Sequence, residues 1–381
     1  MMRFRSVLLI VAALIASRAS EAAAQDSEFG IRGLGFLGRP VSARSAGMAG
    51  GEALFDGGSA VSPASLAAWH GLAGWAVGAE TDRSVSAGTG TQSLRSMRFP
   101  LFGFATTIGG RLVVGVSASD FLNRNWDVQQ TDTVTPRDSA LRVNDRTKSE
   151  GGVTDIRFAA AYRVSSRIAF GVGLHVLSGS VQTAVERDFP TDSAYRTFAQ
   201  VTETDYRGTG VSLGVFVTPL QRVVLGASAR FNGRLRAINP VGTASVHLPT
   251  ELSGGIYIAP VDGVTVASTF THANWSVAAA DLVAAGQAPS RDVWSVGIGA
   301  EVALLKLFGD LTPLRVGYRW RQLPFLVGTD ALSEHATTGG ISFNLAGGRA
   351  NLDLAVEGGS RTAGPLIEKF TTMLVGVSIF P

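Results

Sequence analysis

The sequence predicts an all-β fold: a transmembrane antiparallel β-barrel of about 14 strands with an N-terminal plug, or hatch, in its lumen. The chain of 381 residues contains 46 Gly and only 17% charged residues, and its mean hydropathy is +0.22. Beyond the N-terminus, no apolar run approaches the ~18 residues of a membrane-spanning helix. Apolar and polar residues alternate in short segments instead, as in strands with one face on lipid and the other on a lumen.

Residues 1–24 have the pattern of an export signal. Arg3 and Arg5 precede an apolar run from Val7 to Ala16, and Ala22–Ala24 offers a small-residue cleavage site. The run is too short for a transmembrane anchor, and the absence of Cys excludes a lipoprotein anchor and a disulfide framework. We therefore expect cleavage and a mature protein that crosses the outer membrane of a Gram-negative cell many times.

Residues 25–70 do not alternate and are rich in Gly, Ala and Ser. A barrel of this size has a lumen wider than its own side chains can fill. We therefore expect this segment to fold into the lumen as a hatch. A disordered tail is the alternative, against which the apolar residues Leu34, Phe36, Leu54, Phe55 and Leu66 argue.

From residue 71 to 381, alternation with a period of two predicts the barrel strands. A soluble β-sandwich would also alternate, but its inner faces of Gly, Ser and charged residues would then be exposed to water. The barrel is therefore favoured. Typical outward faces are Phe170, Val172 and Leu174, opposite Gly171, Gly173 and His175; in a strand expected over Val223–Arg236 they are Leu225, Phe231 and Leu235, opposite Ser228, Arg230, Asn232, Arg234 and Arg236.

Connections fall into two alternating classes, as expected when short turns face the periplasm and long loops face outside. Short turns are expected at residues 108–110, 164–166, 218–221, 260–263 and 346–348, with a longer one at 304–311. Long polar loops are expected at 127–148, 186–199, 238–247, 276–290 and 323–334. The last strand ends in Phe380–Pro381 and resembles the signal read by barrel-assembly machinery, although Phe is penultimate here.

No catalytic centre, metal site or cofactor is expected. The five His residues form no H-E-x-x-H motif, and Gly33–Gly38 matches G-x-G-x-x-G but follows no strand. His272, Asn274 and Ser276 share one strand face, and a barrel phospholipase uses these residue types, but a polar rim also explains them. The net charge of +3 is too small for a nucleic-acid binder.

Inward charged and aromatic side chains are the candidates for substrate binding. In one interpretation, the inward charges form ion pairs that brace the wall and the hatch. The inward carboxylates available for such pairs are Asp155, Glu301, Asp353 and Glu357. In the other, an Arg binds the carboxylate head of an amphiphile through two hydrogen bonds, and the apolar tail lies against aromatic residues. The candidate residues are Arg157, His175, Arg230, Arg315, Arg319, Phe216 and Tyr257.

Two segments resemble the FadL/TodX family of outer-membrane proteins. Ala46–Ala53 (AGMAGGEA) and Ser59–Ala67 (SAVSPASLA) are similar to that family's hatch, which reads AGxGGA and then NPAxL, although Ser62 stands where the family has Asn. Residues 248–276 are similar to its proline-led strand, short turn and strand ending in Trp-Ser. The matching hatch residues are Gly47, Met48, Gly50, Gly51, Pro63 and Leu66.

The resemblance implies passive uptake of a hydrophobic molecule, such as a long-chain fatty acid or a hydrocarbon. The molecule would be captured near the extracellular loops, move to a site beside the hatch, and leave through a gap in the wall at a kinked third strand. The stretch Arg111–Trp126 shows no such kink in its sequence. Two alternatives remain: a protein-interaction or secretion component of the same fold, and an open diffusion porin.

Overall fold

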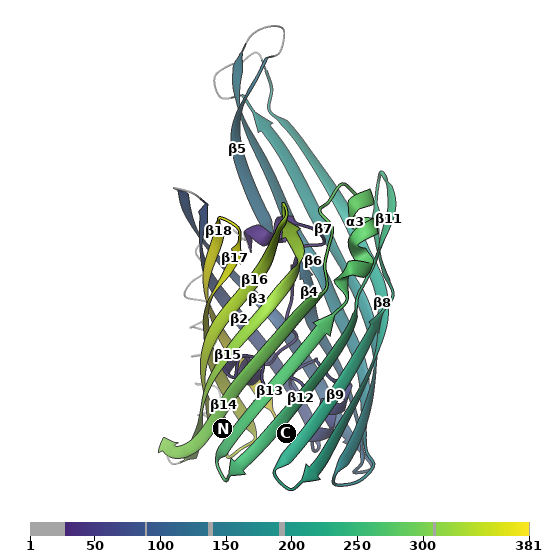
Figure 1. Cartoon of the computed structure of the whole chain (residues 1–381), viewed down its shortest axis with the longest axis vertical. Coiled ribbons are helices and arrows are strands. Elements are labelled where there is room, and N and C mark those ends of the chain that lie inside the picture. Colours follow the sequence, from purple (N-terminus) through teal and green to yellow (C-terminus); the bar gives the residue numbers. More distant parts are fainter. Residues whose placement is uncertain (1–26, 88–89, 136–139, 190–194, 308–309, 381) are drawn as a thin grey trace.

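The structure, a computed structural model, describes residues 27–87, 90–135, 140–189, 195–307 and 310–380. The expected signal sequence lies outside these residues. The described chain forms a closed antiparallel barrel of 14 strands with an N-terminal plug, which confirms the predicted fold class (Figure 1). The barrel closes where the last strand, β18 (Leu366–Ile379), pairs with the first wall strand, β2 (Leu72–Ala87).

Three wall strands are each divided into two parts. These are β4 with β5, β9 with β10, and β11 with β12. In chain order the strands after β2 are β3 (Gly90–Ile108), β4 (Leu112–Asn123), β5 (Trp126–Val134), β6 (Leu141–Arg163), β7 (Ile168–Asp188), β8 (Phe198–Leu220), β9 (Val223–Asn232), β10 (Arg234–Asn239), β11 (Gly242–His247), β12 (Thr250–Val261), β13 (Val264–Ala273), β14 (Val293–Leu307), β15 (Asp310–Val327), β16 (Asp330–Leu345) and β17 (Ala350–Ala363).

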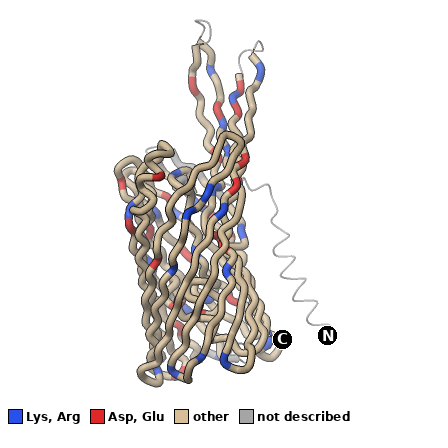
Figure 2. The backbone as a smooth tube through the Cα atoms, turned by 90° about the vertical axis from the view of Figure 1, so that its right-hand side faces the viewer, with Lys and Arg blue, Asp and Glu red and all other residues tan. Residues whose placement is uncertain are grey.

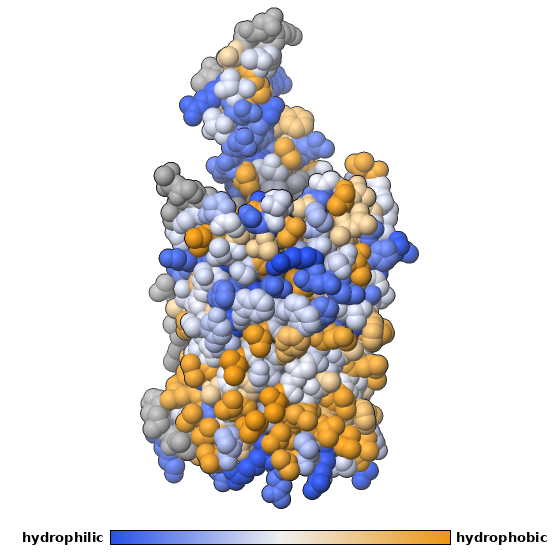
Figure 3. Space-filling view, viewed as in Figure 1, coloured by the Kyte–Doolittle hydropathy of each residue, from blue (hydrophilic) through white to orange (hydrophobic). Residues whose placement is uncertain are grey.

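The outward faces of the strands carry the apolar side chains. Phe170, Val172 and Leu174 are more than half exposed, whereas the intervening inward residues of β7 are buried. On the face seen in Figure 3, apolar side chains form a broad band over the half of the barrel nearest the short turns. Such a band is the lipid-facing surface of a transmembrane barrel. Among the described residues, no helix is long and apolar enough to cross a membrane.

Several segments expected to be long loops are strands instead. Residues 127–148 belong mostly to β5 and β6, residues 238–247 form the β10–β11 hairpin, and residues 323–334 lie mostly in β15 and β16. Residues 276–290 do form a loop, with η4 (Trp275–Ala278) and α3 (Ala279–Ala284). Strands β5 to β8 rise beyond the rim as an arm (Figures 1 and 2). Both faces of the arm meet water, so its polar composition does not distinguish a strand from a loop.

The prediction for Val223–Arg236 is wrong beyond Gly233. The strand is interrupted there, and its register against β8 moves by one residue. A slip of one residue turns every later side chain to the opposite face. Leu235 is therefore 1% exposed and packs with buried apolar residues, whereas Arg234 and Arg236 are exposed.

The hatch is the segment Ser27–Gly71 and contains four short elements. They are η1 (Glu28–Ile31), β1 (Phe36–Leu37), α2 (Ala43–Gly47) and η2 (Pro63–Ala68). Ser62 caps η2, because its side chain accepts a hydrogen bond from the main-chain N–H of Ala64. Pro63 follows at the first helical position, where its missing N–H costs nothing. Ser62 thus does at this position what a capping Asn side chain can also do.

Candidate functional site

Glycines on the wall make room for the first part of the hatch. Gly299 of β14 and Gly317 of β15 lie against Met48, and a Cβ on either would come within 2.5 Å of Met48 main-chain atoms. The hydroxyl of Thr338 on β16 donates a 2.9 Å hydrogen bond to the carbonyl of Gly47. The main chain of the hatch therefore lies directly on the wall at these strands.

A second group of small residues receives η2. Gly171 of β7 faces the main chain of Pro63, and Gly214 of β8 faces the side chain of Ser62. A Cβ on Gly115 of β4 would lie 3.2 Å from the Leu66 side chain. The hatch is held at two separate positions around the lumen, by β14–β16 and by β4–β8.

Ion pairs also join the hatch to the wall. Arg39 pairs with Glu357 of β17. Arg44 of α2 lies 3.0 Å from Glu301 of β14 and 2.8 Å from Glu52 of the hatch itself. Buried charges are stable when they are paired and hydrogen-bonded. These contacts support the interpretation of the inward charges as a bracing network.

A charge cluster of four side chains also lies within the wall. Arg319, Arg321 and Arg361 all donate to Glu334, at 2.9, 2.8 and 2.7 Å. Glu334 is fully buried, so its carboxylate depends on these three guanidinium groups rather than on water. Arg319, a predicted substrate ligand, therefore already has a structural partner.

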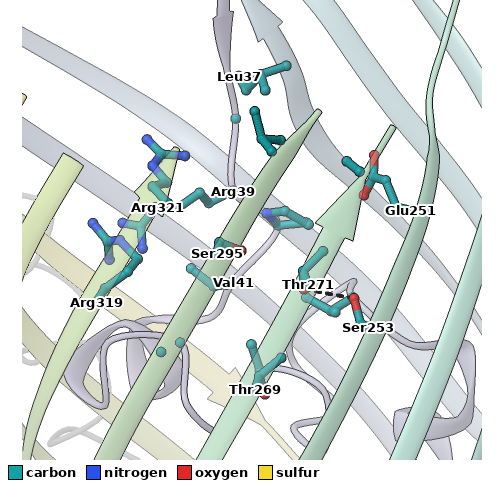
Figure 4. A pocket seen from close by; sticks show the side chains of 18 of the residues that line it. Leu37, Arg39, Val41, Glu251, Ser253, Thr269, Thr271, Ser295, Arg319 and Arg321 are labelled. Atoms are coloured by element: carbon teal, nitrogen blue, oxygen red, sulfur yellow. Dashed lines mark hydrogen bonds between the residues drawn. The ribbon is translucent and has the colours of Figure 1, made fainter. Parts of the chain in front are cut away.

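An upper cavity of about 220 Å³ lies between the hatch and the wall, toward the long-loop end (Figure 4). Leu37 and Val41 of the hatch contribute apolar surface. Ser253 of β12 and Thr271 of β13 lie on the wall and share a 2.8 Å hydrogen bond. Charged side chains, among them Arg39, Arg230 and Glu251, also line the cavity, so its surface is of mixed polarity. Ligand sites combine apolar surface with polar groups in this way.

A lower cavity of about 740 Å³ lies toward the short-turn end, on the other side of the hatch. It contains three of the predicted residues, Arg315, Phe216 and Tyr257. Phe55 of the hatch packs between the two aromatics, with ring-centre distances of 5.3 Å to Phe216 and 6.0 Å to Tyr257. Arg315 pairs with Glu301 at 2.6 Å.

The predicted binding residues therefore do not form one site. Arg230 and Arg319 line the upper cavity, and Arg315, Phe216 and Tyr257 line the lower one. Arg157 and His175 line neither; they belong to a buried polar cluster on β4 and β6–β9. Inward position could be predicted from alternation, but assignment to one cavity depends on where the hatch lies.

The buried cluster resembles a Ser-His-Asp relay in shape. His175 Nδ1 lies 2.9 Å from Asp155 Oδ2, and its Nε2 lies 2.9 Å from Ser212 Oγ. Ser212 is only 3% exposed, and Arg230 donates to the same Asp155 oxygen at 2.7 Å. That guanidinium competes for the charge that would stabilise an imidazolium. The geometry favours a structural role for the cluster, in which the charges of neighbouring strands compensate one another.

The third wall strand is broken. β4 ends at Asn123, and β5 begins at Trp126. β3 pairs with β4 only as far as Leu101 and Ser119. Beyond that point, within the described residues, β3 continues beside β2 and β5 continues beside β6, and the two are not paired with each other. The hydrogen-bonded wall thus has a lateral gap between β3 and the third strand.

The hatch occupies the foot of this gap. β1 pairs with the end of β4, and the N–H of Gly38 donates a 3.0 Å hydrogen bond to the carbonyl of Phe121. Asp120 of β4 and Arg98 of β3 approach to 3.8 Å across the gap. Ser119, Asp120 and Phe121 also line the upper cavity. The cavity therefore reaches the place where the wall is interrupted.

Two asparagines mark the break. The Asn123 side chain accepts from the N–H of Asn125 at 2.8 Å, and the Asn125 side chain accepts from the N–H of Gly151 at 2.6 Å. The main chain also bonds β6 at this point, because the N–H of Arg124 donates a 3.0 Å hydrogen bond to the carbonyl of Gly151. The sequence Asn-Arg-Asn after an alternating strand was the available signal, because Asn favours turns over strand interiors.

No protein-family model and no curated protein sequence matches the chain. Solved structures with little sequence in common share its fold. A FadL homologue from Pseudomonas aeruginosa is similar with a TM-score of 0.64 at 12% identity, covering 90% of this chain and 99% of that one. The CymD monoaromatic hydrocarbon channel gives 0.57 at 16% identity, with 92% and 99% covered. The toluene transporter TodX of P. putida gives 0.52 at 14%, with 84% and 92% covered. The chain thus has the fold that its hatch motif suggested.

Proposed function

We propose that this protein lies in the outer membrane and carries hydrophobic small molecules inward by passive diffusion through its plugged barrel. Long-chain fatty acids and hydrocarbons are the substrate classes that this proposal includes. One observation carries it: a cavity beside the hatch extends to a gap in the wall that only a two-residue hatch strand and neighbouring side chains fill. The titles of the structures with this fold name FadL and hydrocarbon transport, which is consistent with the proposal.

A lateral exit suits an apolar cargo. Transfer of apolar surface into water costs about 25 cal/mol per Å², so a path from the cavity into lipid avoids that cost. On the outer side of β3, Phe99 and Met97 are 62% and 51% exposed at the edge of the gap. An apolar molecule leaving there would meet apolar side chains first.

The hatch strand β1 is the element that must move. It pairs over two residues, Phe36 and Leu37, whereas the wall strands pair over much longer stretches. Elements with few main-chain bonds open at low free-energy cost. A small displacement of β1 would connect the upper cavity to the membrane without unfolding the barrel.

A cleavable cross-link across the gap tests this route. The chain has no Cys, so Arg98→Cys with Asp120→Cys places one thiol on each side. A short bis-maleimide with a reducible linker should stop uptake of radiolabelled toluene or oleate by cells producing the variant, and reduction should restore it.

The control is Thr106→Cys with Val114→Cys, which face each other where β3 and β4 are paired. A bridge there should leave uptake unchanged. If the Arg98–Asp120 bridge forms completely by mass spectrometry and uptake continues at the wild-type rate, the lateral route is wrong.

A further inference from the structure

Three exposed arginines form a cluster on the outer face of the barrel wall and line neither cavity. Arg207 of β8 lies directly opposite Arg236 of β10, and Arg234 lies two residues before Arg236 on the same strand face. Strands β8 and β11 lie on the right of Figure 1, the side that faces the viewer in Figure 2. The register slip at Gly233 creates this arginine cluster, because it turns Leu235 inward and both of its neighbours outward.

The arginine cluster lies next to the lipid-facing surface. β8 pairs with β7 without a register shift, so Arg207 and Val211, four residues apart, share one strand face. Leu174 and Phe231 lie opposite Val211 on the two neighbouring strands, and these three side chains are 51%, 45% and 49% exposed in the order Leu174, Phe231, Val211. Along β8, Arg207 is about 13 Å from this apolar row, toward the long-loop end.

Carboxylates do not neutralise the arginine cluster. Within the described ranges of the chain, none of its three guanidinium groups forms an ion pair. Asp281 lies near Arg234, but its carboxylate bonds the ring of His247 at 2.7 Å. Asp205 lies two residues farther toward the arm on β8, and Glu203 lies beyond it at an exposed position on the arm. The cluster is therefore a positive patch at the edge of the apolar surface.

The facing arginines favour a bound anion. Like charges directly opposite each other destabilise a strand pair, and an anion between Arg207 and Arg236 would relieve that repulsion. A phosphate monoester has three acceptor oxygens and a charge of about −1.5 to −2 at neutral pH, so it can accept hydrogen bonds from both guanidinium groups at once. A carboxylate has two oxygens and a single charge, so it neutralises only one of them.

We propose that the outer face of β8, β10 and β11 binds a membrane lipid with a phosphomonoester headgroup, in the leaflet at the long-loop end. The phosphate lies between Arg207 and Arg236, and the acyl chains lie along the apolar row. Arg234, which already donates to the Ser245 hydroxyl at 3.3 Å, adds a third positive charge. This site is separate from the hatch and from both cavities, so it goes beyond the proposed transport function.

Two lipids that differ only in the phosphate test the proposal: dioleoyl phosphatidic acid and dioleoylglycerol. Native mass spectrometry of the purified full-length barrel in a nonionic detergent, titrated with each lipid, measures each Kd. Phosphatidic acid should bind at least about tenfold more tightly, because hydrogen bonds between charged partners are strong. Its affinity should fall as the salt concentration rises, since the arginines are exposed. Equal affinity for the two lipids would overturn the proposal.

Arg207→Gln combined with Arg236→Gln removes the facing pair. This variant should bind phosphatidic acid at least about tenfold more weakly than the wild type and bind dioleoylglycerol equally well. The matched control combines Arg142→Gln with Arg196→Gln, two exposed arginines of the arm, and should keep the wild-type affinity. Circular dichroism checks that both variants are folded. Unchanged phosphatidic acid binding in the first variant, or an equal loss in the control, would contradict the proposal.

Inorganic phosphate separates lipid binding from the binding of a free anion. At millimolar concentration it should leave phosphatidic acid bound, because the lipid also contacts the apolar row through its acyl chains. Complete displacement by inorganic phosphate would show that the arginines bind a free anion and that no lipid site exists on this face.

Discussion

Gly299 illustrates why the inward faces of this barrel contain so many glycines. Its missing side chain is the space in which the Met48 carbonyl lies. Gly299→Val should push the hatch off β14 and raise the ion conductance of the barrel in a planar bilayer by about an order of magnitude, because the plug no longer fits the lumen. Gly358→Val is the control, since a Cβ there meets nothing within 4 Å. A conductance as low as that of the wild type would show that Gly299 does not seat the hatch.

Glu334 is the residue on which the wall network depends. Glu334→Gln would leave three buried guanidinium groups without their shared carboxylate. Removing one partner from a buried ion pair costs about 3–5 kcal/mol, so the free energy of unfolding in urea should fall by roughly that amount. Glu203→Gln should leave it unchanged. A loss below about 1 kcal/mol would mean that water or other carboxylates replace Glu334.

At the level of elements, Asp281 joins α3 to the β10–β11 hairpin. Asp281 accepts from the main-chain N–H of His247 at 2.8 Å, and its carboxylate lies 2.7 Å from the His247 ring. These bonds hold the pKa of Asp281 below its usual range. A lowered pKa means that the stabilisation is complete above a pH of about 4 and is lost as the pH falls through the folded-state value.

Asp281→Asn should therefore loosen the α3 loop at neutral pH. Amide hydrogen exchange in residues 275–284 should become several-fold faster, while the barrel strands keep their protection. Asp262→Asn, in an exposed turn at the opposite end, serves as the control. If exchange in this loop does not change, the His247 contact does not hold it.

The strands that could be predicted well from the sequence are those with one face toward lipid and the other toward the lumen. Alternation placed Phe170 outside and His175 inside because both environments act along the whole of β7. Alternation failed to predict two regions. In the arm, both faces of the strands are exposed to water. After Gly233, a one-residue slip in register turns Leu235 inward.

The candidate site was less predictable than the fold. Arg230 and Arg319 were expected to face the lumen, and both line the upper cavity. Their separation from Arg315 in the lower cavity could not be predicted, because it depends on where the hatch lies in the lumen. Likewise the gap beside β4 depends on where β3 and β5 separate, and the local sequence holds only Asn123 and Asn125 as a signal.

At the level of the whole molecule, a plugged barrel, a cavity beside the plug and an interruption in the wall occur together. The hatch lies between an upper cavity and a lower one, so we expect it to obstruct the passage of polar solutes through the lumen. The lateral gap gives apolar solutes a different exit. Selectivity for apolar molecules would then arise from the path itself as well as from the binding site.

The most direct test is the ratio of apolar to polar uptake by cells that produce the barrel and lack other transporters for the same compounds. We expect radiolabelled toluene or oleate to enter several-fold faster than in cells without the barrel, while a sugar of similar size enters no faster. Equal acceleration of the sugar would identify an open porin, and no acceleration of any apolar compound would favour a protein-interaction or secretion component. Either result would mean that the barrel does not carry hydrophobic small molecules selectively.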